Sequence, residues 1–111
     1  MGTNRKLPFG YKMEQGRVVV DTGEASWVRY LFGQYNLGVS IRSLTNVMTN
    51  SSVPYDGDKH WNINMVARIL ADQRYIGQGG YPVTLDDGAF YAAMEKRRKK
   101  APTVKKTEAQ K

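Results

Sequence analysis

Cysteine is absent from the sequence, and histidine occurs once, at position 60. Without cysteine the chain can form neither a disulfide scaffold nor a zinc site built on thiolates. The single His60 cannot supply a multi-histidine metal site. We therefore expect no metal and no cofactor.

Long apolar runs are also missing. No window approaches the length of a membrane span, and the first twenty residues lack the charged-then-apolar order of a signal peptide. An apolar fraction of 41% over 111 residues is enough for one small core. We expect one soluble domain over residues 1–100, a disordered basic tail over residues 101–111, and a location in the bacterial cytoplasm.

The net charge of +7 lies mostly near the C-terminus. Residues 95–111 contain eight basic and two acidic residues, whereas residues 1–94 contain nine basic and eight acidic ones. A basic stretch such as residues 96–100 is often a solvated helix end. The charge therefore suggests a polyanionic partner without establishing one.

Apolar spacing and capping residues predict a small, helix-rich α+β domain. Two short strands around residues 15–16 form a first hairpin, and residues 75–84 read as a second hairpin. Helices are expected over residues 21–38, after Ser40, after Asn62, and from residues 86–87 until the chain frays before Pro102. The expected fold is a helix-turn-helix-like three-helix core with two short β-hairpins and a C-terminal helix.

Helical periodicity also predicts which side chains are buried. In the first helix these are Ala25, Val28, Leu31, Phe32 and Tyr35. In the second they are Ile41, Leu44, Val47 and Met48, with Thr45 facing outward. In the third they are Ile63, Val66, Ile69 and Leu70, which leaves Asn64, Met65, Arg68 and Asp72 outside.

The outer face of the third helix carries asparagine and arginine. Such a face suits the DNA major groove, because Asn can bond adenine and Arg can bond guanine. A plain surface helix or a three-helix protein-interaction module fits the same residues equally well.

An ordered series of short segments runs through the chain. It comprises Pro8-Phe9-Gly10-Tyr11-Lys12, Val19-Val20-Asp21, Glu24-Ala25, Val28-Arg29, Leu31-Phe32, Tyr35, Gly38-Val39-Ser40-Ile41, Leu44, Met48, Val53-Pro54, Gly57, Trp61, Val66, Ile69-Leu70, Tyr75-Ile76-Gly77 and Phe90. This series resembles the recombinase domain of the large serine recombinases, which include phage-type integrases and transposon recombinases. The chain departs from the family pattern at Thr22-Gly23, Met48-Thr49 and Ser52, and none of these departures removes an expected DNA contact.

The resemblance implies a site-specific DNA-binding domain that recognises part of an attachment half-site during DNA integration, excision or inversion. In this family a separate catalytic domain carries the serine nucleophile, and a zinc-ribbon domain follows. We therefore expect a middle domain that binds double-stranded DNA, cuts nothing and takes no small-molecule substrate. Its other expected partners are the remaining domains and subunits of the parent recombinase, and the isolated domain is expected to be a monomer.

On this reading the third helix enters the major groove. The residues expected at base edges are Asn62, Asn64, Met65 and Arg68, and those expected at phosphates are Arg42, Asn46, Lys59, His60 and Arg74. Lys96, Arg97 and Arg98 are expected to add DNA contacts from the basic segment.

The sequence offers three alternatives to DNA recognition. A protein-interaction module assembling recombinase subunits would use an exposed apolar patch. A basic RNA-binding domain would stack bases on exposed aromatic side chains, for which the candidates are Trp61, Tyr75, Tyr81 and Tyr91. The least favoured is a metal or hydrolytic site at Asp56, Asp58 and His60, because Asp-Gly-Asp is ordinary turn chemistry.

Overall fold

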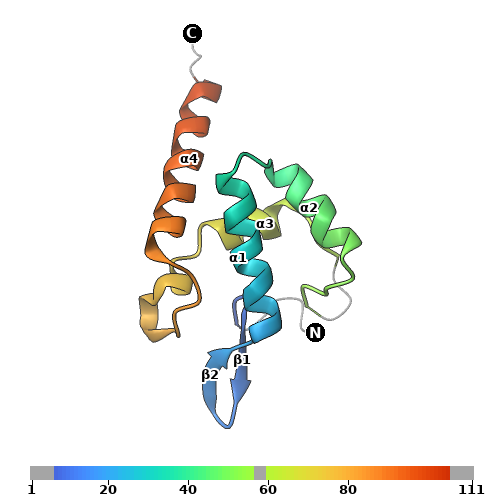
Figure 1. Cartoon of the computed structure of the whole chain (residues 1–111), viewed down its shortest axis with the longest axis vertical. Coiled ribbons are helices and arrows are strands. Elements are labelled where there is room, and N and C mark those ends of the chain that lie inside the picture. The colour runs from blue at the N-terminus through green and yellow to red at the C-terminus, as the bar shows by residue number, and fades with distance from the viewer. Residues whose placement is uncertain (1–6, 57–59, 106–111) are drawn as a thin grey trace.

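The computed structural model describes residues 7–56 and 60–105. One antiparallel hairpin lies at the end of a group of helices, and α1 stands at the centre with α2 and α4 on either side (Figure 1). In chain order the elements are β1 (Tyr11–Glu14), β2 (Arg17–Val20), α1 (Thr22–Asn36), α2 (Ile41–Asn50), α3 (Ile63–Leu70), the 3-10 helices η1 (Gln73–Ile76) and η2 (Gln78–Gly80), and α4 (Asp87–Lys105). The predicted α+β class is confirmed.

The first hairpin forms where the sequence predicts it. Tyr11 pairs with Val20 and Glu14 pairs with Arg17, which leaves Gln15 and Gly16 as a two-residue turn. Both turn residues have positive φ, +51° and +78°, as a type I′ turn requires.

The helix caps also form as predicted, because each depends on a few adjacent residues. The side chains of Asp21, Ser40 and Asn62 accept hydrogen bonds from backbone amides in the first turns of α1, α2 and α3. Glu24 of α1 additionally accepts a 2.8 Å hydrogen bond from the Gly10 amide, which ties the helix to the segment before β1. The five buried residues predicted for α1 are those that the structure buries.

The face that α2 buries differs from the prediction. Leu44 and Met48 are buried as expected, whereas Ile41 and Val47 are only half-buried. Thr45, expected to face outward, is 8% exposed. Its hydroxyl donates to the carbonyl of Ile41 at 2.8 Å, and a hydroxyl satisfied within its own helix can be buried at little cost.

The face that α3 buries is rotated from the one predicted. Met65 is 8% exposed and lies in the core, whereas Ile63 is 42% exposed. The core-facing positions are therefore Met65, Val66, Ile69 and Leu70, which share one side of the helix at a period of 3.6 residues. Ile63 lies at the margin of this stripe, and the flexible Met65 side chain fills the space inside.

The second hairpin does not form, so the prediction of strands over residues 75–84 is wrong. Residues 73–80 form η1 and η2 instead. Gly77, Gly79 and Gly80 have φ of +102°, +72° and +82°, and these left-handed conformations coil the chain where strands would need extended backbone. The amides of Thr84 and Leu85 both donate to the carbonyl of Tyr75, so the following segment lies against η1 without a strand ladder.

The last helix continues further than predicted. We expected α4 to fray before Pro102, but it runs to Lys105. Proline removes one backbone donor, while the lysine and arginine residues that precede it favour helix. Residues 106–111 of the predicted tail lie outside the described residues.

The core lies where α1, α3, α4 and η1 meet the segment before β1. Its largest fully buried side chains are Tyr11, Tyr35, Tyr75, Phe9, Phe32 and Phe90. Among the helices described, none is long and apolar enough to cross a membrane.

Candidate nucleic-acid interface

The exposed side of α3 carries Asn64 and Arg68. They are four residues apart and therefore lie on one helix face, opposite the core stripe. Among residues 7–56 and 60–99, neither side chain has a hydrogen-bond or ion-pair partner. Both are thus available to a ligand that approaches this face.

A first groove lies between α2 and the start of α3. It is lined by Arg42, Thr45, Asn46, Asn62, Ile63 and Asn64. Arg42 and Asn46 are one turn apart on α2 and both are exposed. The groove therefore brings together four of the residues that the sequence singled out, from two helices.

A second groove lies beyond the other end of α3. It is lined by Arg68, Ala71, Asp72, Gln73, Arg74, Gln78 and Gly79. We call the two grooves, together with the face of α3 between them, the α3 surface. Three arginines and one carboxylate belong to it, namely Arg42, Arg68, Arg74 and Asp72.

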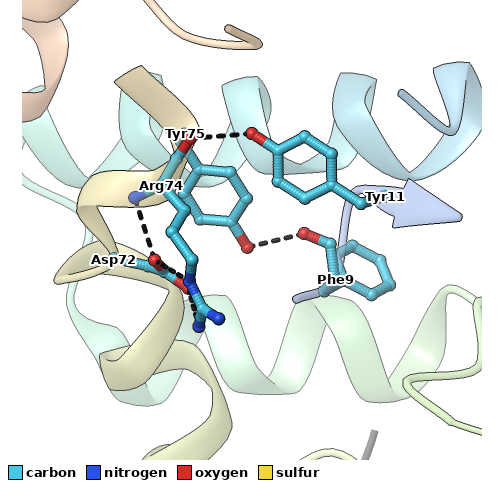
Figure 2. Close-up of polar contacts among 5 residues, drawn as sticks. All are labelled: Phe9, Tyr11, Asp72, Arg74 and Tyr75. Carbon is cyan, nitrogen blue, oxygen red and sulfur yellow. Dashed lines mark hydrogen bonds and ion pairs between the residues drawn. The ribbon is translucent and has the colours of Figure 1, made fainter. Parts of the chain in front are cut away.

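The second groove contains a bidentate ion pair between Asp72 and Arg74 (Figure 2). Asp72 Oδ1 accepts from Arg74 Nε, and Asp72 Oδ2 accepts from Arg74 Nη2, both at 2.8 Å. These hydrogen bonds raise the pKa of the Arg74 guanidinium above its ordinary value, although partial burial opposes the shift. The guanidinium carbon also lies 5.5 Å from the centroid of the Tyr81 ring.

Two buried tyrosines attach η1 to β1 and to the segment before it (Figure 2). Tyr75 Oη donates to the Phe9 carbonyl at 2.6 Å. Tyr11 Oη lies 2.6 Å from the Pro82 carbonyl and 2.9 Å from the Arg74 carbonyl, and these two acceptors share its one hydrogen. The two rings stack with centroids 5.8 Å apart. The backbone around Arg74 is therefore fixed by the Tyr11 hydrogen bond to its carbonyl and by the buried ring of the next residue, Tyr75.

Several predicted contact residues lie elsewhere. Met65 is buried in the core, so the expectation that it faces base edges is wrong. His60 is exposed just before α3, and Lys59 lies outside the described residues.

The three basic residues predicted on α4 interact with the domain itself. Arg97 Nη1 donates to the Ala67 carbonyl at 3.0 Å, and Lys96 Nζ lies 5.5 Å from the Tyr35 ring centroid. Arg98 pairs with Glu95 at 2.7 Å. None of the three lines either groove of the α3 surface.

The sequence reasoning missed Ile63, Gln73 and Gln78, which line the two grooves. The position of Ile63 directly after the Asn62 cap was a usable signal, because the first turn of a helix often lies outside the core stripe. Gln78 was hidden by the mistaken hairpin, which assigned residues 75–84 to strands, whereas Gln73 lies before that segment, at the start of η1.

The RNA-binding alternative requires exposed aromatic side chains on which bases can stack, and Trp61 and Tyr75 are both buried. Trp61 is 8% exposed, and its indole N–H donates to the Val53 carbonyl at 2.7 Å. Tyr75 is fully buried, whereas Tyr81 is half-buried and Tyr91 is exposed. Among the residues that the structure describes, no three metal-ligating side chains gather into a group, and Asp58 is outside that part of the chain.

The fold is shared with solved structures of other proteins. A chain from a crystal structure of a large serine recombinase–DNA complex matches with a TM-score of 0.71 at 18% identity, over 97% of this chain and 38% of that one. A chain from a structure concerned with the sequence requirements of the Listeria innocua prophage attP site matches with a TM-score of 0.68 at 19% identity, over 97% of this chain and 50% of that one. The chain therefore spans half or less of the length of these structural relatives.

No curated protein sequence matches the chain significantly. The family model described as Recombinase matches residues 22–111, which is most of the chain. The resemblance to large serine recombinases seen in the sequence is thereby confirmed, and the chain belongs to the Recombinase family.

Proposed function

We propose that the chain is a sequence-specific DNA-binding domain of a large serine site-specific recombinase. It recognises part of an attachment half-site when DNA is integrated, excised or inverted. The observation that carries this proposal is the α3 surface, where Arg42, Asn46, Asn64 and Arg68 are exposed and have no side-chain ion pair with any described residue.

The proposed pose places α3 in the major groove, with α2 against the backbone in a helix-turn-helix-like arrangement. Arg68 is suited to donate two hydrogen bonds to guanine, and Asn64 to pair with both a donor and an acceptor of adenine. Arg42 and Asn46 then face phosphates across the first groove, and His60 approaches the backbone near the start of α3.

We infer that the domain itself binds DNA and does not cut it. Phosphoryl transfer by a serine nucleophile needs that serine surrounded by cations that stabilise the developing charge. In this proposal another part of the parent recombinase supplies these groups, and its other domains and subunits are the protein partners. The isolated domain acts as a monomer, and its place of action is the bacterial cytoplasm.

Selection of bound duplexes from a random pool at two salt concentrations tests the proposal. We expect a convergent motif of a few base pairs. Arg68→Ala should weaken binding to the selected duplex by about 1–3 kcal/mol and relax one position of the motif. Arg17→Ala is the matched control, since it removes the same charge from the exposed hairpin away from the α3 surface.

Two results would contradict this function. Equal losses by Arg68→Ala on selected and random duplexes would mean that Arg68 reads no base. Binding that never converges and disappears at high salt would mean that the basic C-terminal segment attracts DNA without recognising it.

A protein-interaction role is the second candidate, because an apolar groove lies between α3 and α4. Leu70, Ala71, Phe90 and Met94 line it together with Arg97 and Arg98. If the domain assembles with itself through this groove, sedimentation without DNA should show association that Met94→Glu abolishes.

A further inference from the structure

We propose that Asp72 is a positioning residue for DNA binding: it holds Arg74 so that the guanidinium meets a phosphate beside the base pair read by Arg68. The inference rests on the proposed function and assigns a role to a carboxylate in an otherwise cationic surface. A negative charge at a DNA interface repels phosphate unless it is neutralised, so its presence there calls for a physical account.

Within this ion pair the carboxylate is the more buried partner and the guanidinium is the more exposed one. The Asp72 side chain is 12% exposed, whereas that of Arg74 is 43% exposed. Asp72 Oδ1 also accepts from the Arg74 backbone amide at 3.0 Å, so the carboxylate binds the main chain and the side chain of the same residue. An approaching phosphate would therefore encounter the arginine first.

Asp72 occupies one edge of the guanidinium. Its two hydrogen bonds use Nε and Nη2, and the Nη1 edge is directed away from the carboxylate by the planar geometry of the group. A guanidinium held along one edge has a fixed plane, and its remaining donors keep a fixed direction.

Other contacts limit the freedom of Arg74 further. The Tyr81 ring lies beside the guanidinium, and Tyr11 Oη contacts the Arg74 carbonyl. Immobilising a long side chain on binding ordinarily weakens affinity, because its rotamer freedom is lost. In this domain Arg74 is ordered before DNA arrives.

Arg74 lies in the same groove as Arg68. Ala71 lies between them along the chain, and the small side chain leaves the groove open. A base pair contacted by Arg68 at the end of α3 would thus have a neighbouring phosphate within reach of Arg74, which fixes the register of the helix along the duplex.

The test is Asp72→Asn in the full chain, measured against the selected duplex over a range of salt concentrations. If the carboxylate only neutralises charge, its removal strengthens binding. If it positions Arg74, removal weakens binding about two- to tenfold, which is the effect of one newly mobile side chain, and reduces the salt dependence by up to about one phosphate contact. The amide can still accept from the Arg74 backbone, so we expect the domain to fold, and a thermal unfolding curve checks this.

Three further variants test whether Asp72 acts through Arg74 or only through its charge. Glu14→Gln removes one negative charge from the pair with Lys12 on the hairpin, and we expect it not to weaken binding. In an Arg74→Ala background, Asp72→Asn should no longer weaken binding and should strengthen it, because it removes a carboxylate that has lost its arginine partner. Arg74→Lys keeps the charge but cannot form the two-nitrogen pair with Asp72, and it should weaken binding too.

Unchanged or tighter binding by Asp72→Asn would overturn the proposal, as would an equal loss in the Arg74→Ala background or wild-type affinity in Arg74→Lys. If the wild-type chain selects a motif that depends on Arg68 while Asp72→Asn loses nothing, this inference alone fails. If the wild-type chain selects no motif, the proposed function fails and the inference fails with it.

Discussion

Tyr75 combines a fully buried ring with a hydroxyl that donates to the Phe9 carbonyl at 2.6 Å. Tyr75→Phe removes the donor and leaves that buried carbonyl without this hydrogen bond. We expect the free energy of unfolding to fall by about 1–2 kcal/mol, measured by chemical denaturation. Tyr91→Phe, at a position 51% exposed, is the control and should leave stability unchanged. Equal effects of the two variants would contradict a stabilising role for the Tyr75 hydroxyl.

Two buried tyrosines should make stability depend on pH in the alkaline range. Burial raises the pKa of Tyr11 and of Tyr35 above the ordinary value of 10.0. A hydrogen bond with Thr84 and the charge of Arg74 partly oppose the shift at Tyr11, and the charge of Arg97 partly opposes it at Tyr35. Because folding favours the neutral phenol, the stability from this effect is complete below pH 10.0 and is lost as pH rises above it. The free energy of unfolding should therefore decline through this range, and Tyr11→Phe should make the decline shallower. A rise in stability would refute the argument.

At the scale of elements, α3 depends on the Asn62 cap, whose side chain accepts from the Met65 amide at 3.0 Å. Asn62→Ala should lower the free energy of unfolding by about 0.5–2 kcal/mol, whereas Asn62→Asp retains a capping oxygen and should change it little. DNA binding should respond differently. Asn62→Asp places a negative charge in the first groove and should weaken binding despite an intact helix.

Thermal unfolding and a binding titration on the same samples separate the two effects. Equal destabilisation by both substitutions would argue against a capping role. Undiminished DNA binding by Asn62→Asp would argue that the first groove does not face phosphates.

Local signals explain what the sequence could predict about these elements. The Gln15-Gly16 turn and the caps at Asp21, Ser40 and Asn62 depend on residues close in the chain, and all formed as predicted. The second hairpin failed because the glycines after Tyr75 were interpreted as a turn between strands, while their left-handed backbone coils the chain into η1 and η2.

Tertiary packing decided the remaining differences at the α3 surface. The choice between Ile63 and Met65 as the buried residue depends on how α3 is rotated against the core, which periodicity fixes only to about one residue. The pairing of Arg74 with Asp72 depends on the 3-10 turn after α3, so a phosphate contact was predicted for Arg74 without its carboxylate partner.

Over the whole molecule, the arginines of the α3 surface and most of the net positive charge belong to different parts of the sequence. The α3 surface carries three arginines, while the net positive charge of the sequence lies mainly in residues 95–111. α4 extends past the core toward its C-terminal end (Figure 1). Under the proposed function, the cationic segment would raise the affinity for any duplex, while the α3 surface would select the sequence.

Replacing lysines beyond residue 100 with neutral residues tests whether affinity and sequence selection depend on different parts of the chain. Replacing Lys105, Lys106 and Lys111 by glutamine should reduce the salt dependence of DNA binding by up to about three phosphate contacts and weaken binding to all duplexes alike. The selected motif should remain the same, because the α3 surface is untouched. Arg68→Ala should have the complementary effect, with a relaxed motif and a change of only about one contact in salt dependence. If the triple variant instead lost the motif, the C-terminal lysines would take part in recognition, and charge and sequence reading would belong to one continuous interface.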